Sequence, residues 1–368
     1  MIRRLYVNNY RCLENFDLPI SGRSSTLLMG KNGSGKSTVS YALEVLQKIA
    51  RGTNLVAELV TPKDFTRGRD DVPMRFEIEV ELKGTVYGYE IAFEFPKGFK
   101  ELRVFEEKLL VDGKAVYTRE SDRVHLLRKG KDKEAHFFIN WHLVALPIVQ
   151  ESKDDPLSVF KQWLARALIL SPVPSLIDGE SQEETLKPDR QVTMLAAWFS
   201  GILAHSPSAY STIDQYLKPL MGDLKDIKNP LVGTESRSLI VQFSDAESSM
   251  SLPFKALSDG EKCFMICALV LAANESYGPL LCFWDEPDTH LALSEVSHFI
   301  MALRSAFKTE GQFIMTSHNP EAIRSFSDET TLVLLRKSHL EPTTVRPLSE
   351  LQISGDLITA LLSGDLDA

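Results

Sequence analysis

The sequence predicts an α/β fold with three parts: a mixed or parallel core sheet between helices, an antiparallel β subdomain and a helical insertion. Near both ends of the chain, strongly apolar strands alternate with helices, as in a parallel sheet covered on both faces. Residues 74–95 alternate apolar and polar side chains with a period of two, which is typical of an antiparallel sheet with one wet face. Residues 142–230 show helical patterns punctuated by prolines.

The N-terminal elements frame a glycine-rich loop. Residues 3–20 predict two short strands around a polar turn, and residues 25–30 predict a compact apolar strand. The loop follows, and then a helix from Ser37 to about Arg51, which Gly52 ends.

The remaining elements follow from local patterns. Asp112-Gly113 between two apolar runs is a strong hairpin signal. Residues 156–170 predict one helix, and residues 238–243 predict a strand that returns to the sheet. A helix from Gly260 and alternating strands and helices follow, over residues 280–284, 294–308, 312–317 and 331–335. We therefore expect a split core over 1–72 and 236–345, a β subdomain over 73–140, a helical insertion over 141–235 and a tail over 346–368.

Composition indicates an ordinary globular protein with an acidic balance. Of 368 residues, 43% are hydrophobic and 25% charged, with 41 Lys and Arg against 50 Asp and Glu, a formal charge of -9. A protein that coats DNA by charge alone is normally basic. Any nucleic-acid contact must therefore come from a local patch, a dimer groove or a partner.

Cysteine usage and hydropathy point to the cytoplasm. The longest apolar run, residues 264–273, is shorter than the roughly 20 residues that span a bilayer, and residues 1–12 do not resemble a secretory signal. We expect no membrane association and reduced, buried thiols. The four cysteines are Cys12, Cys263, Cys267 and Cys282, and no two of them have the Cys-x-x-Cys spacing.

The glycine-rich loop carries the strongest motif. Residues 30–37 match GxxxxGK[ST] in full, between an apolar strand and a helix. Its glycines allow successive N–H groups to turn inward at the positive end of the helix, which forms an anion nest. Lys36 would meet the β- and γ-phosphates, Ser37 would offer its hydroxyl to Mg²⁺, and Thr38 would support the α-phosphate. A glycine-rich turn with a solvated lysine is the alternative, which the strand and helix context disfavours. The predicted nucleotide-binding residues are Asn32, Gly33, Ser34, Gly35, Lys36, Ser37 and Thr38.

Two acids follow a buried strand in the second half of the chain. Asp285 ends the apolar run 280–284 and could hold Mg²⁺ through its waters. Glu286 could orient and deprotonate an attacking water, the usual task of a general base in phosphoryl transfer. Two solvated acids at a strand end are the alternative.

A third motif, residues 257–262 (Leu-Ser-Asp-Gly-Glu-Lys), begins an apolar helix. Ser258 and Glu261 form a capping box, and the helix body is apolar nearly all round, so it must be buried. The positive helix end, with the Ser258 hydroxyl and the Gly260 N–H, then faces solvent as an anion site. A capping box by itself also begins helices that bind nothing.

Together these motifs resemble a known family, the RecF/SMC-like predicted ATPases of the ABC class. They also resemble the ATPase half of overcoming-lysogenization-defect nucleases. The resemblance covers roughly residues 1–52 and 236–340. It is carried by residues 4–18, 30–38, 257–262, 281–291 and 316–320.

The resemblance implies an ABC-type P-loop NTPase head that binds ATP with Mg²⁺ and hydrolyses it to ADP and phosphate. In that class, the signature of one subunit, here Ser258 and Gly260, binds the γ-phosphate held by the other, so a homodimer forms around two ATP. His318 matches the switch histidine, which contacts the γ-phosphate and the attacking water, and Asp288 matches the D-loop aspartate that signals between the sites. The implied catalytic residues are Lys36, Glu286 and His318, and the implied metal ligands are Ser37 and Asp285.

Several features remain open. Gln150 is the candidate for a Q-loop, although an ordinary helix-start residue is the better interpretation of it. An arginine finger could come from Arg67 or Arg69, or these residues could form a solvated basic loop. The basic stretch 123–133 suits a phosphate backbone or a partner, or a solvated hairpin edge. Sequence alone predicts no coiled-coil arm and no nuclease domain after the core.

The leading hypothesis is an ATP-driven dimerising switch that acts on DNA or on a separate effector, such as a nuclease, in DNA repair or anti-phage defence. One alternative is the nucleotide-binding subunit of a membrane transporter, which the lack of a clear Q-loop, the RecF-like N-terminus and the departure from LSGGQ disfavour. The other is a non-hydrolysing nucleotide sensor, which Lys36, Glu286 and His318 disfavour.

Overall fold

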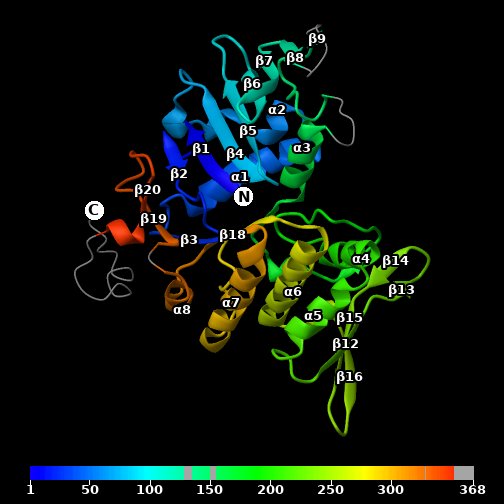
Figure 1. Cartoon of the computed structure of the whole chain (residues 1–368). Helices are drawn as coiled ribbons and strands as arrows, with labels where there is room; N and C mark the ends of the chain where they lie inside the picture. The colour runs from blue at the N-terminus through cyan, green and yellow to red at the C-terminus, as the bar shows by residue number, and fades with distance from the viewer. Residues whose placement is uncertain (128–134, 150–154, 328, 352–368) are drawn as a thin grey trace. The chain divides into compact units, whose positions relative to one another are not determined.

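The computed structural model describes residues 1–127, 135–149, 155–327 and 329–351 (Figure 1). The chain forms two compact units: residues 1–167 with 328–368, and residues 168–327. The four segments expected from the sequence divide the chain differently and stay a prediction.

The first unit contains an eight-stranded sheet in the order β2-β1-β4-β5-β6-β7-β8-β9, antiparallel at every pairing. The predicted hairpin is confirmed, because Asp112 and Gly113 both have positive φ, as a two-residue turn requires. Residues 1–72 were expected to belong to the core, whereas β1 pairs with β4 and so belongs to this sheet. The strands are β1 Ile2–Asn8, β2 Phe16–Leu18, β4 Met74–Leu82, β5 Thr85–Glu94, β6 Arg103–Val111, β7 Lys114–Glu120, β8 Arg123–Leu126 and β9 Ala135–Phe138.

The phosphate-loop motif lies in the same unit, between a buried strand and a helix. Strand β3 (Ser25–Met29) is fully buried and pairs in parallel with β19 (Thr331–Leu335), which β20 (Thr344–Pro347) joins antiparallel. Helix α1 (Lys36–Arg51) packs against α3 (Pro156–Arg166), as Figure 1 shows. The sequence did not predict β20. The short helix α2 covers Val56–Leu59.

The second unit is built on three parallel, buried strands in the order β10-β17-β18, with bounds Leu168–Leu170, Leu281–Trp284 and Gln312–Thr316. Helix α6 (Asp259–Tyr277) contacts α4, α5 and α7, which explains why it is apolar all round. Figure 1 shows α6 and α7 side by side. The other helices are α4 Leu195–His205, α5 Ala209–Leu217, α7 Leu293–Thr309 and α8 Pro320–Arg324.

Two predictions for this unit were wrong. Residues 168–170 are strand β10 and not the end of a helix, because a short apolar run suits either element and pairing with β17 decides it. Residues 238–243 do not return to the core. Strand β15 (Ile240–Ser244) pairs antiparallel with β12 (Leu224–Lys228) and β16 (Ser249–Pro253), and its alternating burial suits a sheet with one buried face.

The chain also contains a second small sheet and several short 3₁₀ helices. A second small sheet contains β11 Glu180–Ser181, β13 Leu231–Val232 and β14 Ser236–Ser238. The 3₁₀ helices are η1 Pro62–Asp64, η2 Thr66–Gly68, η3 Pro174–Leu176, η4 Phe254–Ala256 and η5 Leu348–Glu350. The four cysteines are buried, as predicted. Within the described ranges, no helix combines the length and the apolar character needed to cross a membrane.

Candidate functional site

The phosphate loop has a backbone that only glycine allows at two points. Gly30 has φ 151°, and a Cβ there would lie 2.4 Å from the carbonyl oxygen of Leu334. Gly35 has φ 106°, and a Cβ there would lie 2.9 Å from the Thr343 hydroxyl. The sequence pattern therefore reflects close backbone packing as well as turn geometry.

The open end of α1 suits an anion. No acidic residue lies in its first turn, and Gly35 provides no side-chain cap, so the positive helix end has no compensating charge in its own first turn. Lys36 is buried, and its ammonium donates to the carbonyl oxygens of Gly30 at 2.9 Å and Lys31 at 3.4 Å. The buried Ser34 hydroxyl has no hydrogen-bond partner within the described part of the chain. A phosphate group would fit this donor-rich cradle.

Three residues outside the motif contact the phosphate loop or the first turn of α1. The Cys12 thiol lies 3.4 Å from the Thr38 hydroxyl. The Thr343 hydroxyl donates to the Ser34 carbonyl at 2.8 Å, and Arg336 donates to the Gly33 carbonyl at 3.2 Å. The sequence interpretation missed Arg336 and Thr343, since they lie about 300 positions along the chain and in no motif.

The acidic strand end is organised by Thr316, at the end of the neighbouring strand β18. Its hydroxyl donates to Asp285 Oδ1 at 2.7 Å and accepts from the Glu286 N–H at 2.9 Å. On its other side, Asp285 Oδ2 meets the Arg190 guanidinium at 3.4 Å. Thr316 and Arg190 were both missed. Thr316 lies two residues before His318, at the end of β18. Because β18 pairs in parallel with β17, the position of Thr316 beside Asp285 is predictable from strand pairing.

The side chains of Glu286 and His318 lie close together, as expected for residues that follow two neighbouring strands. Glu286 has φ 49°, an uncommon conformation for a residue with a Cβ, and strain of this kind concentrates at functional sites. Its Oε1 lies 3.5 Å from His318 Nε2, and the side chains are 46% and 44% exposed. Both are therefore accessible to a ligand.

Asp288, two residues after Glu286, is buried. Its Oδ2 accepts from the Ser317 hydroxyl at 2.6 Å, and the same hydroxyl accepts from the Asn319 N–H at 2.9 Å. Burial raises the pKa of Asp288. The contact connects the segment after Glu286 with the segment that carries His318.

The helix start at Ser258 has the predicted capping box. Ser258 Oγ accepts from the Glu261 N–H at 3.3 Å, and its N–H and hydroxyl both donate to Glu261 Oε2 at 2.7 Å. Gly260 lets the start of α6 lie close to the backbone of His290, because a Cβ at position 260 would lie 3.1 Å from the His290 carbonyl oxygen. Lys262 is buried and donates to the Pro174 carbonyl at 3.0 Å, a contact that the sequence did not reveal.

The candidates for a Q-loop, an arginine finger and a basic contact surface differ in what the structure describes of them. Gln150 and residues 128–133 of the basic stretch lie outside the described residues. Arg67 and Arg69 both form ion pairs with Glu14, and Arg67 also donates to the Leu340 carbonyl. These pairs favour a structural role for the two arginines within the first unit.

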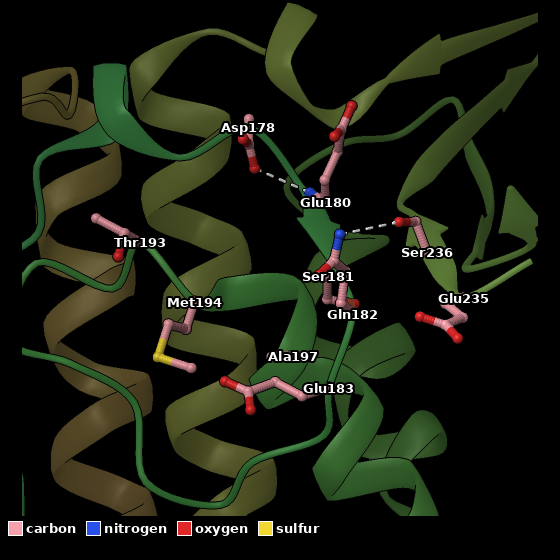
Figure 2. Close-up of a pocket in the computed structure, with 10 residues that line it drawn as sticks. All are labelled: Asp178, Glu180, Ser181, Gln182, Glu183, Thr193, Met194, Ala197, Glu235 and Ser236. Atoms are coloured by element: carbon pink, nitrogen blue, oxygen red, sulfur yellow. Dashed lines mark hydrogen bonds between the residues drawn. The ribbon is translucent and has the colours of Figure 1, made fainter. Parts of the chain in front are cut away.

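A pocket of about 620 Å³ lies elsewhere in the second unit (Figure 2). Its lining includes the carboxylates of Asp178, Glu180, Glu183 and Glu235, which would repel phosphate groups. Asp178 accepts from the Glu180 N–H at 2.9 Å. This acidic pocket is therefore unsuited to a nucleotide.

A glycine-rich loop between a buried strand and a helix, together with an acid pair ending a buried parallel strand, defines the class of P-loop nucleotide-binding proteins. More narrowly, the chain belongs to the RecF/RecN/SMC N-terminal domain family, whose model matches residues 1–340.

Solved structures show the same fold. One is the crystal structure of the SmcHead bound to the C-winged helix domain of ScpA, with TM-score 0.56 and 14% identity over 95% of this chain and 99% of that chain. Another is the Smc head domain with an extended coiled coil, bound to the C-terminal domain of ScpA derived from Pyrococcus furiosus. Its TM-score is 0.52, with 13% identity over 95% of this chain and 97% of that chain. The predicted ABC-type head is confirmed as a fold.

A curated relative shares a short segment. The OLD nuclease of Thermus scotoductus (strain ATCC 700910 / SA-01) is 44% identical over 46 residues. The match covers 12% of this chain and 8% of that protein. The alignment leaves most of that nuclease without a counterpart in this chain.

Proposed function

We propose that the chain binds ATP with Mg²⁺, hydrolyses it to ADP and phosphate, and uses the cycle as a switch between two copies of itself. The observation that carries the proposal is the phosphate loop, with a buried lysine ammonium held by two backbone carbonyls at an uncompensated helix start. The family match supports it, because SMC-like heads are generally ATPases.

Each residue has a role that its surroundings support. Lys36 and the N–H groups of the loop would hold the β- and γ-phosphates. The Ser37 hydroxyl and the Asp285 carboxylate would hold Mg²⁺, which prefers oxygen ligands and would offset the phosphate charge. Asn32, Gly33, Ser34, Gly35 and Thr38 complete the proposed binding set.

Glu286 would accept a proton from the attacking water, while His318 would orient that water and the γ-phosphate. The 3.5 Å contact of the two side chains and their half-exposed positions support this assignment. Asp288 is proposed to connect the reacting centre with the dimer interface through Ser317.

The exposed helix start at Ser258 supports the proposed dimer. Ser258 and Gly260 would bind the γ-phosphate on a second copy, related to the first by two-fold symmetry. For this, the Ser258 hydroxyl must turn from Glu261, to which it now donates. Closing two copies around two ATP would then depend on the γ-phosphate.

The switch is proposed to act on DNA or on a partner effector, in DNA repair or anti-phage defence, within the cytoplasm. Two matching Smc head structures are complexes with domains of ScpA, and the relative that matches over 46 residues is a nuclease, which supports a partner protein for this chain. The acidic net charge of -9 favours a protein effector over extensive DNA coating.

The Glu286→Gln variant tests the ATPase and the dimer together. We expect it to bind ATP, to hydrolyse ATP about 100-fold or more slowly, and to accumulate as a dimer by light scattering. Glu310→Gln, an exposed acid in the same unit, is the matched control and should behave as wild type. A monomer at saturating ATP, or an unchanged rate, would contradict the proposal.

The ATP-locked variant also tests the effector. Tagged Glu286→Gln protein, loaded with ATP, should retain either duplex DNA or a second protein that the ADP-bound wild type releases. Recovery of neither, in gel-shift and co-purification assays, would count against a DNA or effector role.

A further inference from the structure

The loop between β19 and β20, residues 336–343, forms hydrogen bonds with the phosphate loop. Arg336 donates to the Gly33 carbonyl at 3.2 Å, and its other N–H groups donate to the carbonyls of His339 at 2.8 Å and Glu341 at 3.0 Å. The guanidinium thus fixes its own loop and reaches one phosphate-loop carbonyl. The next carbonyl along the phosphate loop, that of Ser34, is taken by Thr343.

Thr343 is placed firmly enough to hold that carbonyl. It is 2% exposed, and its N–H donates to the Cys12 carbonyl at 2.9 Å, which anchors its backbone to the turn between β1 and β2. Its hydroxyl donates to the Ser34 carbonyl at 2.8 Å. Because the site is buried, water cannot readily replace this bond.

The geometry of the peptide unit converts this contact into an orientation. In a trans peptide, the carbonyl of one residue and the N–H of the next point in opposite directions. When Thr343 captures the Ser34 carbonyl, the N–H of Gly35 must therefore point away from Thr343. Gly35 is the N-cap of α1, so this N–H belongs to the helix start where an anion is favoured.

We propose that Thr343 is a positioning residue of the phosphate site, which orients the Gly35 N–H toward bound phosphate by holding the Ser34 carbonyl outside. The inference rests on the proposed ATP binding and deepens it. Without the hydroxyl, the Ser34–Gly35 peptide can rotate, since Gly35 has no Cβ to restrict it. The consequence is weaker phosphate binding, while the chemistry after binding is unchanged.

The test is a graded series at position 343 in the full chain, read with a fluorescent ATP analogue. Thr343→Val keeps the shape and removes the donor, Thr343→Ser keeps the donor, and Thr343→Cys offers a weak one. We expect Val to weaken ATP binding about 10-fold, Cys to be intermediate and Ser to stay within about 2-fold of wild type. In hydrolysis assays, Val should raise KM and leave kcat unchanged.

Thr344→Val is the matched control, because that hydroxyl is exposed and donates to the Leu335 carbonyl at 3.4 Å. It should bind ATP as wild type does. Thermal melting of every variant separates lost binding from lost fold. If the Val variant does not fold, the order of affinity Ser above Cys decides the matter by itself.

The outcomes separate the inference from the proposed function. Equal ATP affinity across the folded variants, with wild type binding ATP, would overturn the role of Thr343 and leave ATP binding intact. A fall in kcat at constant KM would also overturn it. If wild type itself bound no ATP, the proposed function would fall, and this inference with it.

Discussion

The phosphate loop and the acidic end of β17 differ in what holds them. The phosphate loop is held through its backbone, since Arg336 and Thr343 take its carbonyls and two glycines allow the path. The acidic end is held through side chains, because Thr316 and Arg190 each take one oxygen of Asp285. Backbone N–H and carbonyl groups have a direction that the fold fixes, and they carry no titratable proton. Side chains, in contrast, can rotate away from one hydrogen-bond partner and toward another. The first region therefore suits binding, and the second suits a changing reaction centre.

The largest effect should come from Lys36, the side chain within the phosphate loop that brings a buried positive charge to the site. Lys36→Ala removes a buried ammonium, and we expect ATP affinity to fall by about 100-fold or more in calorimetry. Lys31→Ala, an exposed lysine of the same loop, should change affinity by less than about 3-fold. Equal losses in the two variants would show that general charge, and not the position of Lys36, binds ATP.

Thr316 should separate the two regions most clearly. Thr316→Val keeps the volume and removes the hydroxyl that serves Asp285 and Glu286, so we expect kcat to fall about 10- to 30-fold. ATP affinity should stay within about 2-fold, and Thr316→Ser should restore kcat. Weaker ATP binding with unchanged kcat would reverse the assignment of the two regions.

Arg190 gives a third comparison, because its guanidinium contacts the carboxylate of Asp285, the proposed metal ligand. Arg190→Gln removes the competing cation, so the Mg²⁺ concentration for half-maximal ATP binding should fall about 2- to 5-fold. Titration with Mg²⁺ at fixed ATP, followed by the fluorescent analogue, measures this directly. A higher Mg²⁺ requirement would instead show that Arg190 assists the metal site.

The smallest effect concerns Asp288. Burial raises the pKa of this carboxyl, so folding favours its protonated form, and stability is lost as pH rises through the folded pKa. Asp288→Asn lacks this loss and should melt about 1–2 °C higher than wild type near pH 8. The advantage should shrink near pH 5, where more of the wild-type carboxyl is protonated. An advantage that grows at low pH would contradict the buried-carboxyl account.

Sequence reasoning succeeded where a motif is contiguous and failed where an element depends on distant pairing. The strand, loop and helix around Lys36, and the capping box at Ser258, are local and were predicted within a residue or two. Strand β10 was mistaken for a helix, since three apolar residues carry no periodicity and only pairing with β17 defines them.

Three of the missed site residues have the same cause. Arg190, Arg336 and Thr343 reach their partners through the fold, across 95, 303 and 309 positions. Nothing in their own neighbourhoods distinguishes them from ordinary loop residues. Tertiary structure is required to find supports that act on a motif from outside it.

The central claim is that each ATP is closed over by two copies of the chain, and complementation of two inactive variants tests it most directly. Glu286→Gln lacks the base, and Ser258→Arg blocks the helix start. Mixed before ATP is added, they should form heterodimers with one complete site and recover about a quarter of the wild-type rate. A mixture no more active than the two variants assayed separately, with both folded by circular dichroism, would contradict the claim.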